Sequence, residues 1–273
     1  MIDATRLAGL QEKARSARRD IVTMVHRANS GHVGGSLGAA DIMVALYHDV
    51  MRLDPTDPRW DLRDRFVLSK GHCTPVLYAV LAQRGFFPRE DLETFRRVGS
   101  HLQGHPYQPK TPGVDASTGT LGLGLSTACG MALAARLRGA RHYTYVLCGD
   151  GEQQEGQIWE AAMFAHKYRL DHLIAFTDRN RLQTDGDTED VMPLDPLADK
   201  WRAFGWHTLE IDGHDFHQIL DAISRAKNEQ GRPTMIIANT IKGKGVSFME
   251  HGVQWHGTPP DAAEHARALA ELG

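Results

Sequence analysis

The sequence lacks a long apolar run, a basic excess and a cysteine pattern, and each absence excludes a class of protein. No stretch approaches the roughly 18 apolar residues of a membrane span, and the first residues show no basic-then-apolar signal pattern. We therefore expect a cytoplasmic protein without a membrane partner. With 31 basic against 34 acidic side chains, the chain has no positive excess to follow a phosphate backbone, so nucleic acid is not an expected partner. The three cysteines form neither a CxxC pair nor an even set, and we expect them to be reduced.

The usual nucleotide-binding signatures are also missing. No GxxxxGK[ST] motif occurs, and Gly149-x-Gly151 is followed by Gln154 where a dinucleotide fingerprint requires glycine. The missing motifs disfavour both ATP and NAD as ligands. What the sequence does have is 27 glycines and 15 histidines. Glycine in such numbers indicates backbone that takes positive φ or approaches a ligand closely.

Short apolar runs alternate with amphipathic stretches along most of the chain. The runs predict strands at residues 65–68, 143–147, 173–176, 208–211 and 234–238. The amphipathic stretches predict helices at residues 3–28, 42–50, 75–84, 119–137, 157–168, 196–204 and 216–228, with a glycine-rich turn at 31–36. This alternation is typical of the α/β class, with a mostly parallel sheet and helices on both faces. A length of 273 residues and 41% hydrophobic side chains fit one domain over residues 1–273.

Small polar residues gather directly after the predicted strands. The segments 69–72, 149–151, 177–180, 212–214 and 239–245 are rich in Gly, Asp, Asn and His. In open α/β sheets, ligands bind outside the carboxyl ends of the strands. We therefore expect the functional site along that edge.

Asp150 and Asn180 follow consecutive strands and can lie on adjacent strand ends. A carboxylate and an amide oxygen suit Mg²⁺, which takes its remaining oxygens from water or a bound phosphate. The free N–H groups around Gly151 suit an anion. Taken singly, Gly149-Asp150-Gly151 is better explained as a tight turn and Asn180 as an Asx turn. The two together at this spacing favour a site for a metal and a diphosphate.

The segment Gly149-Asp150-Gly151, followed by Glu155-Gly156 and by Asn180, resembles the thiamine diphosphate motif of transketolases. Further blocks resemble that family in the same order, at residues 31–32, 69–72, 104–106, 111–115, 117–124 and 255–257. The resemblance covers nearly the whole chain but only the first part of a full-length transketolase. It implies the thiamine diphosphate-binding fold and, within it, the diphosphate-binding domain. The pyrimidine-binding and C-terminal domains have no counterpart in residues 1–273.

The resemblance assigns roles to individual residues. Asp150 and Asn180 would ligate Mg²⁺ (or Ca²⁺) through their side chains and Leu182 through its carbonyl, and Gly151 would donate its amide to the diphosphate. The other assigned residues would contact the cofactor, the sugar or a second subunit. His72 and His256 would flank the cofactor, Gly119 and Leu121 would line its rings, His32 and His105 would face the sugar, and Glu160 would lie at the subunit interface.

Three residues depart from the family pattern. Thr120 and Leu123 replace a common proline and glutamine and alter the loop over the cofactor. Tyr107 follows His105-Pro106 where an acidic residue is frequent, which leaves the sugar substrate open.

The resemblance implies the N-terminal subunit of a two-chain transketolase. Such an enzyme transfers a two-carbon ketol unit between sugar phosphates through thiamine diphosphate. The partner would be a C-terminal subunit carrying the pyrimidine-binding domain, and self-pairing would give a homodimer or an α₂β₂ heterotetramer. Small residues of the helix expected at 119–137 would let a partner approach or would pack on the chain's own sheet: Ala128, Gly130, Ala132 and Ala135.

Other functions stay open at this point. A related thiamine enzyme, such as a deoxyxylulose phosphate synthase, fits the cofactor motif. A metal-dependent phosphohydrolase would use Asp150 and Asn180 but would need a nucleophile or a second metal cluster, and none is evident in the sequence. A non-catalytic regulatory subunit is disfavoured by the full set of histidines.

Overall fold

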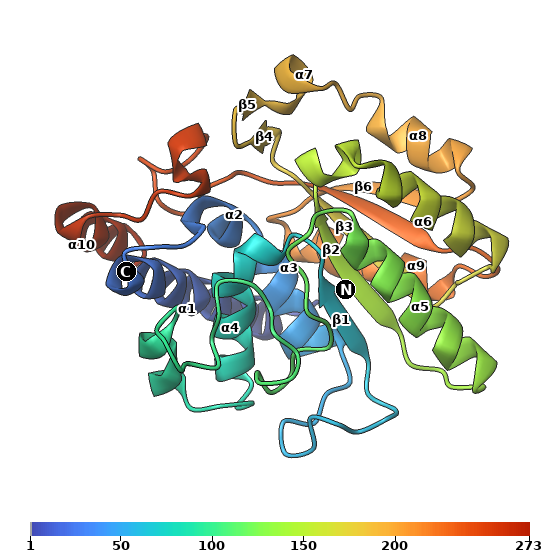
Figure 1. Ribbon diagram of the computed structural model, residues 1–273, viewed down its shortest axis with the longest axis horizontal. Coiled ribbons are helices and arrows are strands. Elements are labelled where there is room, and N and C mark those ends of the chain that lie inside the picture. The colour runs from blue at the N-terminus through green and yellow to red at the C-terminus, as the bar shows by residue number, and fades with distance from the viewer. Residues whose placement is uncertain (1) are drawn as a thin grey trace.

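The structure is a computed structural model that describes residues 2–273, and a five-stranded parallel sheet lies at its centre (Figure 1). The strands lie side by side in the order β1 (Arg65–Leu68), β2 (Thr144–Gly149), β3 (Leu173–Arg179), β7 (Thr234–Asn239) and β6 (His207–Asp212). The predicted parallel sheet is confirmed. β3 is longer than expected because its pairing with β7 continues to Arg179 opposite Asn239. Asp178, expected in the turn after β3, therefore lies within the strand.

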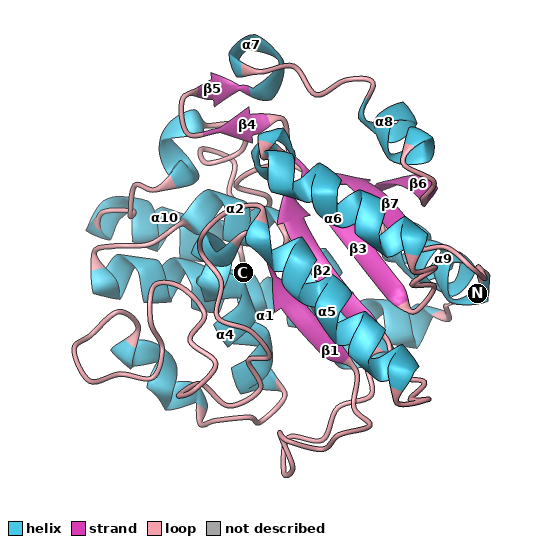
Figure 2. Cartoon of the chain, turned by 45° about the vertical axis from the view of Figure 1, so that its right-hand side comes forward, coloured by secondary structure: helices cyan, strands magenta, loops and turns pink. Residues whose placement is uncertain are grey.

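Helices cover both faces of the sheet, as predicted. Because side chains alternate along each buried strand, such a strand contributes apolar side chains to both faces. On β2, Val146 and Cys148 join a hydrophobic cluster with α5 (Leu123–Leu137), α6 (Gly156–Lys167) and α8 (Leu197–Ala203). Tyr145 and Leu147 face the opposite cluster. That cluster includes α1 (Ala4–Ala28), α2 (Val33–Gly38), α3 (Ala40–Ala45), α4 (Thr74–Gln83) and α9 (Phe216–Asn228). Figure 2 shows α5 and α6 lying across one face.

The remaining elements are short or peripheral. They are η1 (Leu46–Val50), η2 (Gly71–Cys73), η3 (Arg89–Thr94), η4 (Gly151–Gln154), the hairpin β4 (Leu182–Gln183) and β5 (Gly186–Asp187), α7 (Thr188–Val191), η5 (Val253–His256) and α10 (Ala262–Glu271). None of the helices between residues 2 and 273 combines the length and the apolarity that a membrane crossing needs.

The glycine-rich turn predicted at 31–36 is wrong beyond His32, because a helix begins at Val33. Gly34 serves close packing instead of a turn. A Cβ at this position would lie 2.8 Å from the Trp255 carbonyl oxygen and 2.9 Å from the Lys242 side chain. The absence of a side chain therefore lets α2 press against the loops that follow β7.

The helix expected at 119–137 begins only at Leu123. Gly119 and Gly122 have φ of +143° and +88°, conformations that a right-handed helix excludes. Ala128, Ala132 and Ala135 are buried rather than free for a partner, and α5 packs on β1, β2 and α6. The interpretation of these three alanines as a docking face is wrong, and only Gly130 of the set is exposed.

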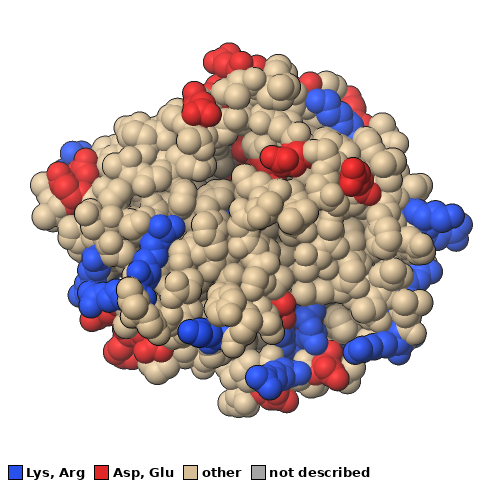
Figure 3. Space-filling model, in the orientation of Figure 1, with Lys and Arg blue, Asp and Glu red and all other residues tan. Residues whose placement is uncertain are grey.

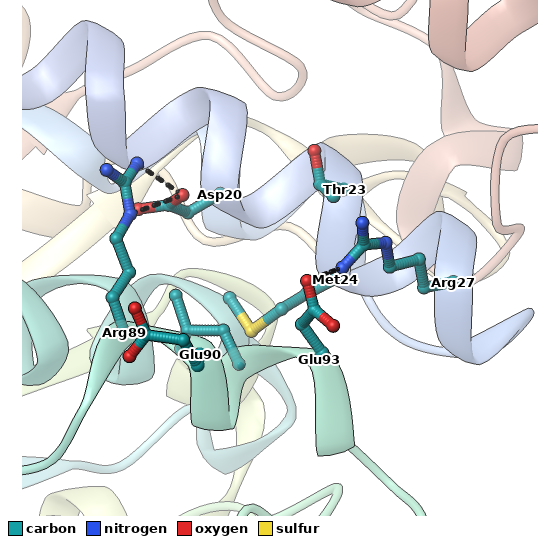
Figure 4. Close-up of a pocket in the computed structure, with 8 residues that line it drawn as sticks. Asp20, Thr23, Met24, Arg27, Arg89, Glu90 and Glu93 are labelled. Atoms are coloured by element: carbon teal, nitrogen blue, oxygen red, sulfur yellow. Dashed lines mark hydrogen bonds and ion pairs between the residues drawn. The ribbon is translucent and has the colours of Figure 1, made fainter.

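A hollow of about 270 Å³ separates α1 from η3 (Figure 4). Two ion pairs cross it, Asp20 with Arg89 at 2.7 Å and Arg27 with Glu93. They fasten η3 to the long N-terminal helix. The segment that follows η3 continues to Gly104 and His105. The two ion pairs therefore fix the start of a segment that reaches the site described below.

Two substitutions on α5 test which face packs on the sheet. We expect Ala132→Leu to lower the free energy of unfolding by about 1–3 kcal/mol, because it overfills a buried helix–sheet contact. Gly130→Ala, on the exposed side of the same helix, should raise it by about 0.5–1 kcal/mol, since a Cβ there meets nothing within 4 Å. Urea unfolding of the isolated chain measures both, and equal effects of the two variants would contradict this orientation of α5.

Candidate active site

A cavity of about 440 Å³ opens at the carboxyl edge of the sheet, where the sequence predicted a site. It brings together all the predicted site residues except Glu160, which is exposed on α6. The predicted residues that line it are His32, His72, His105, Gly119, Leu121, Asp150, Gly151, Asn180, Leu182 and His256. Figure 3 shows a hollow in the upper part of the visible face of the molecule, with acidic side chains along one side of the hollow.

Three of the four predicted histidines form a compact cluster, although they come from separate loops. The ring centroids of His32 and His72 lie 5.0 Å apart, those of His72 and His256 5.2 Å, and those of His32 and His256 5.4 Å. His72 follows β1 within η2, His32 precedes α2, and His256 ends η5. The fold therefore places three imidazoles against one another beside the strand ends.

The surroundings hold these histidines in the neutral form. Burial, followed by the charge of Arg96, lowers the pKa of His32 to about 4. Burial and the Lys242 ammonium lower the pKa of His256 to about 3, and burial with Lys70 lowers that of His72 well below its usual value. Neutral imidazoles at pH 7 can both accept and donate protons, as general acid–base chemistry requires.

His105 also lines the cavity and is more exposed than the other three histidines. Its ring packs on Gly119, where a Cβ would lie 2.9 Å from the His105 ring. Burial and Arg96 lower the pKa of His105. His105 also borders a second hollow of about 630 Å³ that Tyr107 and Lys110 line. The unusual Tyr107 thus lies next to a predicted sugar-facing residue.

The oxygen atoms predicted to bind a metal lie on adjacent strand ends. β2 and β3 pair with Gly149 opposite Asp178, which places Asp150 and Asn180 side by side beyond the sheet. Asp150 is 2% exposed, and its two oxygens accept the amides of Gly151 at 2.8 Å and Arg181 at 2.5 Å. Carboxylate, amide and carbonyl oxygens together suit a hard divalent cation, so the donor set fits the predicted metal.

Lys242 contacts one of these oxygens, the Leu182 carbonyl, and the sequence motifs assigned it no role. Its ammonium donates to the Leu182 carbonyl at 2.7 Å and lies 3.1 Å from Nδ1 of His256. Burial and the neighbouring Lys70 lower the pKa of Lys242 to about 8. The only signal in the sequence was that Lys242 lies shortly after β7, in the segment that leaves the sheet at its carboxyl edge.

A buried ion pair lies beneath the cavity and was also missed. The Lys70 ammonium donates to Asp178, and the side chains are 2% and 0% exposed. Thr240 donates its hydroxyl to the other oxygen of Asp178. Burial opposes the charge on both partners, but the contact with Asp178 raises the pKa of Lys70 and the contact with Lys70 lowers that of Asp178. The pair fastens the turn that carries His72 to the middle of the sheet.

Comparisons with known proteins agree with this geometry. Residues 11–273 match the family model described as transketolase, thiamine diphosphate binding domain. The chain belongs to the transketolase family. It is 50% identical to the 6-deoxy-6-sulfo-D-fructose transketolase subunit of Clostridium sp. over 96% of each chain. It is 44% identical to one of the apulose-4-phosphate transketolase subunits of Phocaeicola vulgatus, over 96% of this chain and 93% of that protein.

Solved transketolases share the fold as well. The enzyme from Campylobacter jejuni superposes with a TM-score of 0.92 at 36% identity, over 97% of this chain but only 42% of its own. The predicted family, the α/β fold and the assignment as one chain of a thiamine diphosphate-dependent transketolase are confirmed at the level of the family. The chain thus spans less than half of the transketolases whose structures it matches.

Substitution of Lys70 tests whether its ion pair with Asp178 stabilises the structure that carries the site. We expect Lys70→Met to lower the free energy of unfolding by about 3–5 kcal/mol, because it leaves the Asp178 carboxylate buried without its counter-ion. Adding Asp178→Asn should recover part of that loss by removing the uncompensated charge. Urea unfolding at neutral pH measures both variants. A loss below about 1 kcal/mol in Lys70→Met would show that the pair does not support this region.

Proposed function

We propose that this chain is the cofactor-binding subunit of a two-chain transketolase that moves a two-carbon ketol unit from a ketose to an aldose. The observation that carries the proposal is one cavity that gathers four histidines with lowered pKa values and the oxygen donors of Asp150, Asn180 and Leu182. Proton-transfer groups and a site for a metal and a diphosphate are what this reaction requires. Family membership supports the same reaction class.

Asp150, Asn180 and the Leu182 carbonyl would hold Mg²⁺, or Ca²⁺ in its place. Because Lys242 donates to the Leu182 carbonyl, it would release this oxygen when a divalent cation binds. The Lys242 ammonium would then be free to face the diphosphate. The Gly151 amide donates to Asp150 and would turn to the diphosphate as an additional donor.

Thiamine diphosphate, when bound, would supply the carbanion chemistry needed to transfer the two-carbon unit. The chain's own residues bind it and move protons around it. His72 and His256 would flank the cofactor, with Gly119 and Leu121 against its rings. His32 and His105 would accept a proton from a hydroxyl of the donor sugar and return it to the oxygen of the acceptor. Their lowered pKa values leave both imidazoles unprotonated at pH 7, so that each has a ring nitrogen free to accept a proton.

A second polypeptide would supply the pyrimidine-binding domain, with residues 1–273 forming the single diphosphate-binding domain. The outer faces of α5 and α6 expose large apolar side chains, among them Leu123 at 48%, Met163 at 56% and Phe164 at 38%. Figure 3 shows few charged side chains in the middle of this face. Such a surface is usually covered by a partner. Glu160 also lies on α6, as expected of an interface residue. Two-fold pairing of the two-chain unit would give an α₂β₂ heterotetramer.

The substrates would be sugars with an anionic end. The two relatives named above belong to a 6-deoxy-6-sulfo-D-fructose and an apulose-4-phosphate transketolase, and both named sugars carry an anionic group. The three buried, unpaired cysteines agree with a reducing compartment such as the cytoplasm.

The other candidate functions receive less support. A phosphohydrolase would need a nucleophile or a second metal cluster, and residues 2–273 contain no group of three His, Cys, Asp or Glu side chains placed to hold a metal. A deoxyxylulose phosphate synthase would share the cofactor site, but the relatives named above are transketolases.

Substitution of Asp150 tests the metal and diphosphate site. We expect Asp150→Asn to weaken binding of thiamine diphosphate with Mg²⁺ by about 100-fold or more, because even outer-shell partners of a metal contribute about 10- to 100-fold. Calorimetric titration of the reconstituted complex measures this. Asp190→Asn, at an exposed position of α7, is the control and should bind normally. Unchanged affinity in Asp150→Asn would remove Asp150 from the metal site.

The requirement for a partner gives the decisive test of the function. With thiamine diphosphate and Mg²⁺, the purified chain alone should turn over no ketose phosphate or sulfonate. Adding a polypeptide that carries the pyrimidine-binding domain should restore ketol transfer. Met163→Glu should fold normally yet fail to assemble with that polypeptide in gel filtration, because it places a charge on the apolar face of α6. Robust turnover by the chain alone would refute the two-chain enzyme.

A further inference from the structure

Glu152 is a buried carboxylate that the proposed reaction does not use. It lies in η4, two residues after Asp150, and is 3% exposed. Oε1 accepts the Ser69 hydroxyl at 2.5 Å and the Gly122 amide at 2.9 Å, and Oε2 accepts the Gly149 amide at 2.9 Å. Both oxygens of one carboxylate are therefore engaged.

The three donors belong to three separate segments around the cavity, and one of them, Gly149, is the last residue of β2. Ser69 begins the turn that carries His72, Gly149 directly precedes Asp150, and Gly122 ends the loop that contains Gly119 and Leu121. These segments are far apart in the sequence. The Glu152 side chain joins all three at one point in the wall of the cavity.

The loop at 119–122 depends most on this contact. Gly119 and Gly122 both have positive φ, so the loop contains residues with wide conformational freedom. Gly122 precedes α5 as its N-cap residue and offers no side chain to cap the first amides. A carboxylate near the start of a helix is also favoured by the helix dipole. Glu152 thus supplies from another loop the anchor that the local sequence lacks.

The chemistry of the contact requires a carboxylate rather than an amide. Two backbone N–H groups, those of Gly122 and Gly149, approach different oxygens of Glu152. A glutamine of the same shape has one oxygen and one NH₂ group, so either orientation would place a donor against one glycine N–H. An unpaired buried donor is costly. Burial raises the pKa of Glu152, and the Ser69 hydroxyl, the two amides and Lys70 oppose that rise.

We propose that Glu152 is a positioning residue that holds the His72, Asp150 and Gly119–Leu121 loops in register and so forms the cofactor-binding cavity before the cofactor arrives. The inference rests on the proposed function for its meaning, but the contact itself involves only the chain's own residues. Its loss should therefore be visible both in the free chain and in cofactor binding.

Hydrogen exchange of the cofactor-free chain is the first measurement. In Glu152→Gln, peptides covering residues 118–125 and 147–153 should exchange about tenfold faster than in the wild type or more, because a buried amide has lost its acceptor. Exchange in α1 should not change. Ser69→Ala is the matched variant, since it removes one donor and leaves both glycine amides satisfied; its effect on these peptides should stay below about threefold. Glu90→Gln, an exposed glutamate outside the cavity, is the control and should change nothing.

Cofactor affinity in the reconstituted complex is the second measurement. Glu152→Gln should raise the Kd for thiamine diphosphate with Mg²⁺ by about tenfold or more; Ser69→Ala, which loses only the link to the His72 turn, should raise it less, and Glu90→Gln should stay near the wild type. Faster exchange in both peptides together with this loss of affinity supports the proposal. Exchange that is unchanged in both peptides, or raised equally in α1, overturns it.

Failure of the proposed function would look different. If the wild-type complex binds no thiamine diphosphate, the proposed function falls, while the exchange of the free chain still decides whether Glu152 joins the loops. If Glu152→Gln does not fold, hydrogen exchange of the wild-type chain tests the proposal instead. Rapid exchange of the Gly122 and Gly149 amides in the wild type overturns the proposal, and slow exchange of both supports it.

Discussion

The ion pair between Lys70 and Asp178 is the contact on which the rest of the site depends. Removing two charges from water is unfavourable, and the pair is tolerated because each partner is the other's counter-ion and Asp178 also accepts a hydrogen bond from Thr240. It links the turn after β1 to the carboxyl end of β3, the middle strand of the sheet. With Asp178 neutralised in this way, Asp150 can remain a carboxylate at the neighbouring strand end. Burial and then Asp178 raise the pKa of Asp150, whereas the Gly151 amide and the Arg179 guanidinium, 3.6 Å away, lower it.

The same electrostatics serves both parts of the proposed chemistry. Lys70, Lys242 and Arg96 place positive charge around the cavity, and together with burial they lower the pKa of the clustered histidines. An imidazole that stays neutral can take a proton from a sugar hydroxyl. Positive charge that is not fully compensated also favours an anion in the cavity, as a diphosphate would be. One distribution of charge therefore prepares the proton-transfer groups and the cofactor-binding end.

Much of the fold could be predicted from the sequence because hydrophobic runs and helical periodicity are local signals. The helix at Phe216–Asn228 and the strand at Arg65–Leu68 agree with their predicted bounds. The glycines of α2 and the alanines of α5 were misinterpreted because small residues serve turns, partner contacts and internal packing alike. Lys70 and Asp178 stood in segments assigned to the site edge, but no local pattern states that they meet. Glu152 had no signal beyond its closeness to the metal-site motif, since it acts through partners on other loops.

The exposure of His105 indicates why a site of this kind requires a second chain. His32, His72 and His256 are more buried than His105, and burial is the largest cause of the lowered pKa in all four. The segment 119–123, whose Gly119 lies against the His105 ring, also exposes the side chains of Leu121 and Leu123. A partner packed on these leucines would withdraw water from that side of the cavity. Burial of His105 would then lower its pKa further, toward the values of the other three histidines. Assembly would thus complete the electrostatic environment of the site as well as its walls.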